Sequence, residues 1–150
     1  MNCFLVDAEA TRLQGLQLAQ YLPAGALLLL SGPLGAGKTA LVQGIAAGLG
    51  ITEAVTSPSY ALAQHYYCRG ESAPALIHLD LYRLEQAIAA DELFFQEAEE
   101  ALACNSLMAV EWPERLSALP TGAWLLQLSL EGEGRRFQLQ APLKANKKLL

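Results

Sequence analysis

The segment Gly32-Pro33-Leu34-Gly35-Ala36-Gly37-Lys38-Thr39 constrains the fold of this chain more than any other feature of its sequence. It matches the pattern G-x-x-x-x-G-K-[ST], which is typical of loops that bind nucleotide phosphates. Its glycines allow backbone angles that turn successive N–H groups toward a phosphate. Lys38 can reach the β- and γ-phosphate oxygens, and the Thr39 hydroxyl can complete the coordination of Mg²⁺. The segment therefore predicts a site for a nucleoside triphosphate and Mg²⁺.

The residues on either side of this loop support the same interpretation. The run of four leucines at 27–30 predicts a strand that is buried on both faces. Residues 38 to about 49 predict a helix that Gly50 closes as a C-cap. A loop that leads from a buried strand into a helix places the phosphates at the positive end of the helix dipole.

The rest of the sequence predicts an α/β fold in a single domain covering residues 1–150. A P-loop NTPase-like three-layer sandwich is expected, with a mainly parallel central sheet and antiparallel additions. The further expected helices cover 10–22 and 85–103, the further strands cover 60–67, 76–80 and 107–110, and an antiparallel hairpin is formed by 124–130 and 137–140.

Composition limits where such a chain can act. Hydrophobic residues make up 53% of the chain and charged residues 17%, which is typical of a globular protein with a sizeable core. No apolar stretch is long enough to span a membrane, and the acidic N-terminus does not resemble a signal peptide. The three cysteines are far apart and have no metal-ligand spacing. We therefore expect a cytoplasmic protein with free thiols.

The charge is distributed unevenly along the chain. Residues 1–134 contain five basic residues and all fifteen acidic ones, a net charge of −10, whereas the last sixteen residues carry +5. An acidic body repels a phosphate backbone, which argues against direct binding of nucleic acid. The basic tail, at about 142–150, is expected to be a solvated end, with a docking patch as the alternative.

Two carboxylates follow predicted buried strands. Asp80 ends the strand at 76–80, and Glu111 follows the strand at 107–110. Because the carboxyl ends of parallel strands face the ligand crevice, either acid could hold Mg²⁺ or orient water, and either could instead cap a loop. His78 lies within an apolar strand, where a structural histidine is at least as good an interpretation as a catalytic base. Arg83 could be structural or could brace a carboxylate.

Four segments together resemble the TsaE (YjeE) family, bacterial ATPases that support the threonylcarbamoyladenosine modification of tRNA. They are Gly35-Ala36-Gly37-Lys38-Thr39, Val55-Thr56-Ser57-Pro58-Ser59-Tyr60, His78-Leu79-Asp80-Leu81-Tyr82-Arg83 and Glu111-Trp112-Pro113-Glu114. The resemblance covers roughly residues 5–140, and the last three segments are specific to this family among P-loop proteins.

The resemblance implies roles for individual residues. ATP would be bound by Gly35, Ala36, Gly37, Lys38, Thr39 and Ala40, with Thr11 and a basic residue of the last hairpin, Arg135 or Arg136, flanking the nucleotide. Mg²⁺ would be held by Thr39 and Glu111, and Asp80, Glu111 and Lys38 would serve hydrolysis. Ser57 and Ser59 would belong to a switch that senses the γ-phosphate. The implied partners are the TsaD and TsaB proteins, which modify adenosine 37, and tRNA would be reached only through that complex.

The sequence also departs from the family pattern. Pro33 stands where the family usually has an acidic residue, Ser59 stands where it usually has threonine, and residues 84–110 match poorly. Two other functions could use the same phosphate loop. A small-molecule kinase would need a lid with several arginines, whereas this chain has six arginines, scattered along its length. A nucleotide-gated binding module would resemble the accessory role of the family, with slow and incidental ATP turnover.

Overall fold

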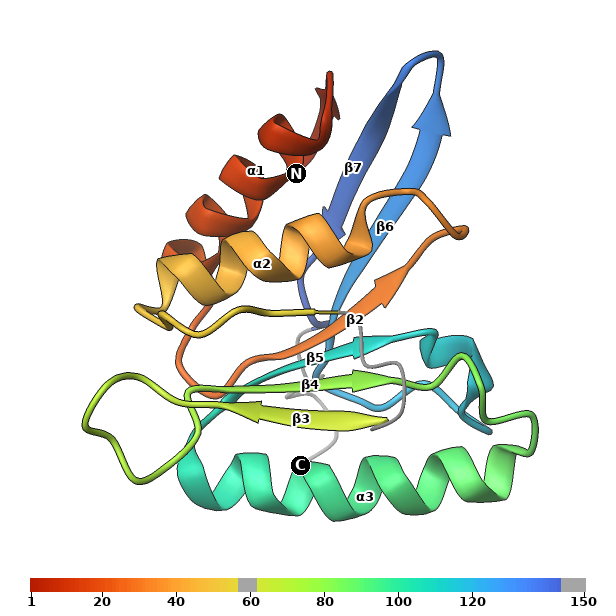
Figure 1. Ribbon diagram of the computed structural model, residues 1–150. Helices are drawn as coiled ribbons and strands as arrows, with labels where there is room; N and C mark the ends of the chain where they lie inside the picture. Colours follow the sequence, from red (N-terminus) through yellow and green to blue (C-terminus); the bar gives the residue numbers. More distant parts are fainter. Residues whose placement is uncertain (57–61, 144–150) are drawn as a thin grey trace.

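A computed structural model of the chain describes residues 1–56 and 62–143 (Figure 1). The helices are α1 (Ala8–Tyr21), α2 (Lys38–Gly48), α3 (Ala87–Cys104) and a short 3₁₀ helix, η1 (Pro113–Arg115). The strands are β1 (Asn2–Leu5), β2 (Leu27–Ser31), β3 (Ala63–Tyr66), β4 (Leu76–Asp80), β5 (Leu107–Glu111), β6 (Trp124–Glu131) and β7 (Gly134–Gln140).

The strands form one seven-stranded sheet in the order β1-β7-β6-β2-β5-β4-β3. The four central strands, β6, β2, β5 and β4, are parallel to one another, while β7 and β1 on one side and β3 on the other are added in antiparallel pairing. The predicted parallel centre with antiparallel additions is therefore confirmed. In the central register Glu111 pairs with Leu30 on one side and with Asp80 on the other. The carboxyl ends of β2, β5 and β4 consequently lie side by side.

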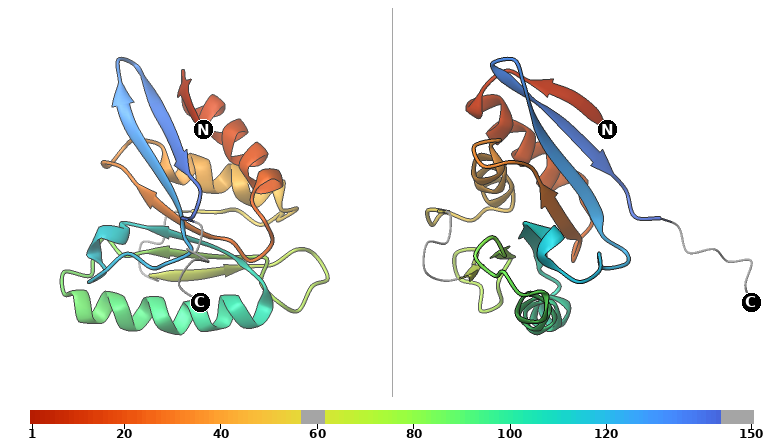
Figure 2. Two further views of the ribbon diagram at one scale, coloured as in Figure 1. Left: turned by 180° about the vertical axis from the view of Figure 1, so that it is seen from behind. Right: turned by 90° about the vertical axis from the view of Figure 1, so that its right-hand side faces the viewer.

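Helices cover the two faces of the sheet and bury two apolar cores. Along β2, Leu28 and Leu30 pack into the core beneath α1 and α2, whereas Leu29 packs into the core beneath α3. This alternation follows from the pleat of a strand, in which successive side chains point to opposite faces. Figures 1 and 2 show α1 and α2 on one side of the sheet and α3 on the other. The expected three layers are thus present.

Glycines allow α1 and α2 to pack very closely. A Cβ atom added to Gly44 would lie 1.9 Å from the carbonyl oxygen of Arg12, and one added to Gly15 would lie 2.2 Å from that of Leu41. Both contacts are with backbone atoms, which cannot move aside as a flexible side chain could. Since α2 starts at the end of the phosphate loop, this packing also fixes the position of the loop.

Several boundaries differ from those predicted. The first helix starts at Ala8 because the Asp7 carboxylate accepts a hydrogen bond from the Ala10 N–H at 2.8 Å and so caps the helix. Strand β1 and helix η1 were not predicted, and both are very short. The second hairpin strand begins at Gly134 instead of Phe137. The predicted strand at 60–67 begins, within the described residues, at Ala63.

No helix among the described residues is long and apolar enough to cross a membrane.

Candidate nucleotide-binding site

The phosphate loop connects the buried strand β2 to the N-terminus of α2, as predicted. Gly37 precedes the helix with a φ of +105°, in the left-handed region that favours glycine. A Cβ atom at this position would also lie 2.5 Å from Arg135 Nη1 and 3.4 Å from Thr11 Cγ2. Gly37 is therefore required for both its backbone angle and the space around it.

The same contacts show where the two predicted flanking residues lie. Thr11 is fully buried, and its hydroxyl donates a hydrogen bond to the carbonyl oxygen of Asp7 at 2.9 Å. The Arg135 guanidinium lies over Gly37, and its Nε is buried without a hydrogen-bond partner among the described residues. By contrast, Arg136 donates two hydrogen bonds to the Glu131 carboxylate, at 2.7 and 2.8 Å. Of the two arginines left open by the sequence, only Arg135 contacts the loop in the described part of the chain.

Lys38 is 6% exposed at the start of α2. Its ammonium donates a hydrogen bond to the carbonyl oxygen of Gly32 at 2.5 Å and lies 4.0 Å from the centre of the Trp112 ring. Burial lowers the pKa of Lys38, while the carboxylates of Glu111 and Asp80 act in the opposite direction. The amine is therefore held within the loop by a carbonyl and an aromatic face, and the charges of Glu111, Asp80 and Glu114 favour its protonated form.

Trp112 lines the pocket beside this lysine. Its backbone is left-handed, with a φ of +57°, which is uncommon for a bulky residue. This turn directs the chain from the end of β5 into η1. The Trp112 ring packs against the Tyr82 ring, with 4.9 Å between their centres. This ring contact connects the segments that follow β4 and β5.

The two predicted acids end adjacent strands. The Asp80 carboxylate accepts a hydrogen bond from the Tyr82 N–H at 3.0 Å. Burial raises the pKa of Asp80, and the bond from Tyr82 acts against this change. Glu111 is 3% exposed, and its Oε2 lies 2.6 Å from His78 Nε2. This contact supports the interpretation of His78 as a structural, hydrogen-bonded histidine.

A pocket of about 360 Å³ brings most of these residues together. Of the predicted site residues it is lined by Gly35, Gly37, Lys38, Thr39, Asp80 and Glu111. Leu34, Leu62, Tyr82, Arg83 and Trp112 complete the described lining. Leu34 belongs to the predicted loop and Arg83 had been left open between a structural role and bracing a carboxylate, whereas Leu62, Tyr82 and Trp112 had no predicted role. Tyr82, Arg83 and Trp112 belong to the segments that carried the family resemblance, and this signal could have identified them.

The remaining predicted residues lie elsewhere or cannot be placed. The side chain of Ala36 is fully buried in the core beneath α1 and α2, and Ala40 is half-buried within α2. Neither side chain lines the pocket. Ser57 and Ser59, the predicted switch residues, lie outside the described residues, as do the lysines of the basic tail.

The residues of the pocket fit a magnesium ion. No group of three or more His, Cys, Asp or Glu side chains in residues 1–56 and 62–143 could hold a metal by itself. Mg²⁺ at nucleotide sites does not need such a group, because it takes one or two carboxylates together with phosphate oxygens and waters. The Thr39 hydroxyl and the carboxylates of Asp80 and Glu111 line one pocket and supply the oxygen ligands that this ion prefers.

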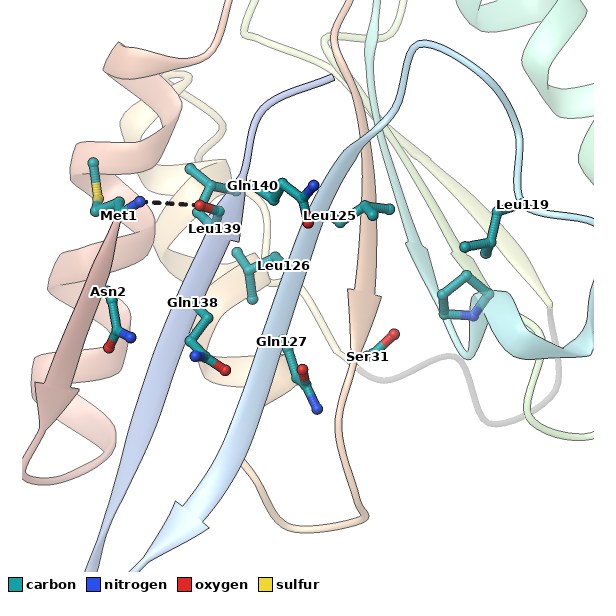
Figure 3. Close-up of a pocket in the computed structure, with 11 residues that line it drawn as sticks. Met1, Asn2, Ser31, Leu119, Leu125, Leu126, Gln127, Gln138, Leu139 and Gln140 are labelled. Carbon is teal, nitrogen blue, oxygen red and sulfur yellow. Dashed lines mark hydrogen bonds between the residues drawn. The ribbon is translucent and has the colours of Figure 1, made fainter. Parts of the chain in front are cut away.

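A second hollow, of about 570 Å³, lies on the face of β6 and β7 that α1 and α2 do not cover (Figure 3). Its lining, as far as the structure describes the chain, includes the amides of Asn2, Gln127, Gln138 and Gln140 but no charged side chain. Within residues 1–56 and 62–143, no residue predicted for the nucleotide or the metal lines it. The loop lysine and the two strand-end acids line the smaller pocket instead.

A glycine-rich loop between a buried strand and a helix, with acids at the ends of adjacent parallel strands, defines a P-loop nucleotide-binding protein. The family model described as "Threonylcarbamoyl adenosine biosynthesis protein TsaE" matches residues 5–138. The chain belongs to the TsaE family, and the resemblance noted in the sequence is confirmed.

Individual relatives cover most of the chain. The protein named tRNA threonylcarbamoyladenosine biosynthesis protein TsaE in Synechocystis is 47% identical over 124 residues, which are 81% of this chain and 75% of that protein. The protein of the same name in Treponema pallidum is 34% identical over 137 residues, which are 91% of this chain and 96% of that protein. A crystal structure of Bacillus subtilis YdiB matches with a TM-score of 0.72 and 26% identity, covering 95% of this chain and 86% of that chain.

Proposed function

We propose that this protein binds ATP with Mg²⁺ in the 360 Å³ pocket and hydrolyses it as an accessory step of tRNA threonylcarbamoyladenosine biosynthesis. In its nucleotide-dependent states it acts on the TsaD–TsaB complex, which forms the modification on adenosine 37 of tRNAs that read codons starting with A. Membership of the TsaE family supports the pathway. The observation that carries the proposal is that the loop lysine and both strand-end acids line one pocket.

Each residue of the pocket has a physical role in this proposal. The backbone N–H groups of Gly35 to Ala40 and the N-terminus of α2 surround the phosphates. Lys38 leaves the Gly32 carbonyl and neutralises the β- and γ-phosphate oxygens. Thr39 and Glu111 would hold Mg²⁺, and the ion would supply positive charge beside those oxygens during hydrolysis.

Asp80 is proposed to position the attacking water. Its carboxylate is anchored by the Tyr82 N–H and lines the pocket, so it can accept a hydrogen bond from a water beside the γ-phosphate. Phosphoryl transfer depends on this kind of positioning and on charge neutralisation more than on covalent chemistry. Thr11 and Arg135 are proposed to flank the nucleotide from the other side of Gly37.

The kinase alternative receives less support from the pocket. Kinases of small molecules clamp the transferred group with several cationic side chains and close a lid over it. The described lining of this pocket contains one arginine, Arg83, and one lysine, Lys38. The nucleotide-gated module remains compatible with the proposal, because slow turnover would still reset a complex.

The role of Ser57 and Ser59 as a switch stays a prediction, as does the cytoplasmic location.

A pull-down with purified TsaD and TsaB tests the proposal. A conformational response to ATP requires that the partner complex bind the two nucleotide states with different affinities. We expect the TsaD–TsaB complex to retain the protein more strongly with a slowly hydrolysed ATP analogue than with ADP. Retention that is the same with the analogue, with ADP and without nucleotide would contradict the proposed mechanism.

A further inference from the structure

His78 and Asp80 of β4 and Glu111 of β5 face the same side of the sheet. Along β4, Ile77 and Leu79 pack into the core beneath α3. His78 and Asp80 alternate with them and therefore face the side of α1 and α2. Glu111 occupies the equivalent position at the end of β5, opposite Asp80 in the register. His78 thus lies two residues before Asp80 on the same face of β4, and it does not line the pocket itself.

The His78–Glu111 contact is fully enclosed. The side chain of His78 is 0% exposed and that of Glu111 is 4% exposed, and Nε2 and Oε2 are 2.6 Å apart. The other ring nitrogen, Nδ1, is buried and has no hydrogen-bond partner among the described residues. A buried N–H without an acceptor is costly, so the proton belongs on Nε2, where it is donated to the carboxylate. The contact then fixes Oε2 of Glu111, a residue that lines the pocket.

We infer that His78 is a positioning residue, which holds the Glu111 carboxylate in the orientation that binds Mg²⁺; this inference rests on the proposed function. His78 touches neither nucleotide nor metal and acts through Glu111 alone. Groups that orient a metal ligand in this way commonly change metal affinity by 10- to 100-fold when they are removed.

The test measures how Mg²⁺ strengthens the binding of a slowly hydrolysed ATP analogue, by calorimetry on the full chain. His78→Leu should raise the Mg²⁺ concentration at half-effect by roughly 10-fold or more, while binding of the analogue without Mg²⁺ changes little. His78→Gln places an amide N–H near the position of Nε2 and should restore part of the effect. A merely structural role would instead weaken binding equally with and without Mg²⁺.

The chain offers a matched control in His65. Its Nε2 also lies 2.6 Å from a glutamate oxygen, in this case Glu97 Oε2, and neither residue lines the pocket. His65→Leu should therefore leave the Mg²⁺ dependence unchanged. In a Glu111→Gln background, His78→Leu should add no further shift. A shift of the same size in that background would overturn the inference, because His78 would then not act through Glu111.

A second measurement does not depend on the stability of any variant. Nitrogen-15 NMR of the unsubstituted protein should show His78 with its proton on Nε2, and a proton on Nδ1 would overturn the inference. If His78→Leu has the same Mg²⁺ dependence as the parent protein while Glu111→Gln does not, the inference fails and the proposed function stands. If Mg²⁺ has no effect on the parent protein, the proposed function fails and the inference falls with it.

Discussion

At the scale of single residues, Arg135 and Arg136 show how one strand separates two similar side chains. They are consecutive in β7, so they point to opposite faces of the sheet. The Arg135 guanidinium lies over Gly37, and the Arg136 guanidinium pairs with Glu131. The alternation itself follows from the sequence. Arg135 shares its face with Phe137 and Leu139, which pack into the core beneath α1 and α2. The predicted strand began only at Phe137, so the alternation was not extended to the two arginines.

Arg135→Ala is predicted to weaken ATP binding. A hydrogen bond to a charged group is worth about 1.5–3 kcal/mol, so the dissociation constant measured by calorimetry should rise roughly tenfold or more. Arg136→Ala is the matched control and should leave this constant unchanged, because Arg136 is directed away from the loop. A larger loss for Arg136→Ala than for Arg135→Ala would show that the two arginines have been assigned the wrong way round.

Asp80→Asn is predicted to stabilise the nucleotide-free fold while it stops hydrolysis. Burial raises the pKa of Asp80 in the folded state, so folding is disfavoured once the pH is high enough to ionise this carboxyl. The Asn variant should therefore unfold at a higher temperature near pH 7. Its advantage should shrink as the pH falls through the raised pKa, and it should vanish below the ordinary pKa of an aspartate. Thermal unfolding followed across this range provides the measurement.

Asp91 provides a control of opposite sign for that experiment. Ser117 donates hydrogen bonds to the Asp91 carboxylate from its hydroxyl and its backbone N–H, and these bonds lower the pKa of Asp91. Asp91→Asn should therefore give no gain in unfolding temperature near pH 7. If Asp80→Asn were less stable than the parent protein at this pH, the unfavourable burial of the Asp80 charge would be refuted.

At the scale of elements, the sequence predicted the parts whose patterns are strong. Runs of apolar residues predicted β2, β4 and β5, because strands buried on both faces are nearly continuously apolar. Strand β1 has only four residues and is held at the edge by its pairing with β7, so no local pattern indicated it. The contact between His78 and Glu111 joins residues 33 positions apart and could only appear once the strands were paired.

Gly44→Ala is predicted to destabilise the protein by about 1–3 kcal/mol. Alanine normally stabilises a helix interior relative to glycine by roughly 1 kcal/mol, so the sign of the change is diagnostic. Here the added Cβ would meet the Arg12 carbonyl and push α1 away from α2. Urea unfolding would measure the change, with the exposed Ala47→Ser on the same helix as a control that stays within about 0.5 kcal/mol. A stabilised Gly44→Ala would contradict the close packing of α1 on α2.

At the scale of the whole molecule, the charge distribution bears on how the protein meets RNA. Neutralising a phosphate backbone requires a surface of lysine and arginine, and residues 1–134 carry a net charge of −10. We predict that the isolated chain does not hold tRNA at physiological salt, and that tRNA is retained only when the TsaD–TsaB complex is present. Filter binding with labelled tRNA would measure this, and tight binding by the chain alone would contradict it.

The central claim is that the pocket at the phosphate loop binds ATP, and calorimetric titration of ATP in the presence of Mg²⁺ tests it most directly. Lys38 is the one lysine among the described residues that line this pocket, and its replacement leaves phosphate charge uncompensated. The account predicts binding by the parent protein and a loss of about 1.5–3 kcal/mol in Lys38→Ala, at least tenfold in the dissociation constant. Equal affinity in the parent protein and in Lys38→Ala would contradict it.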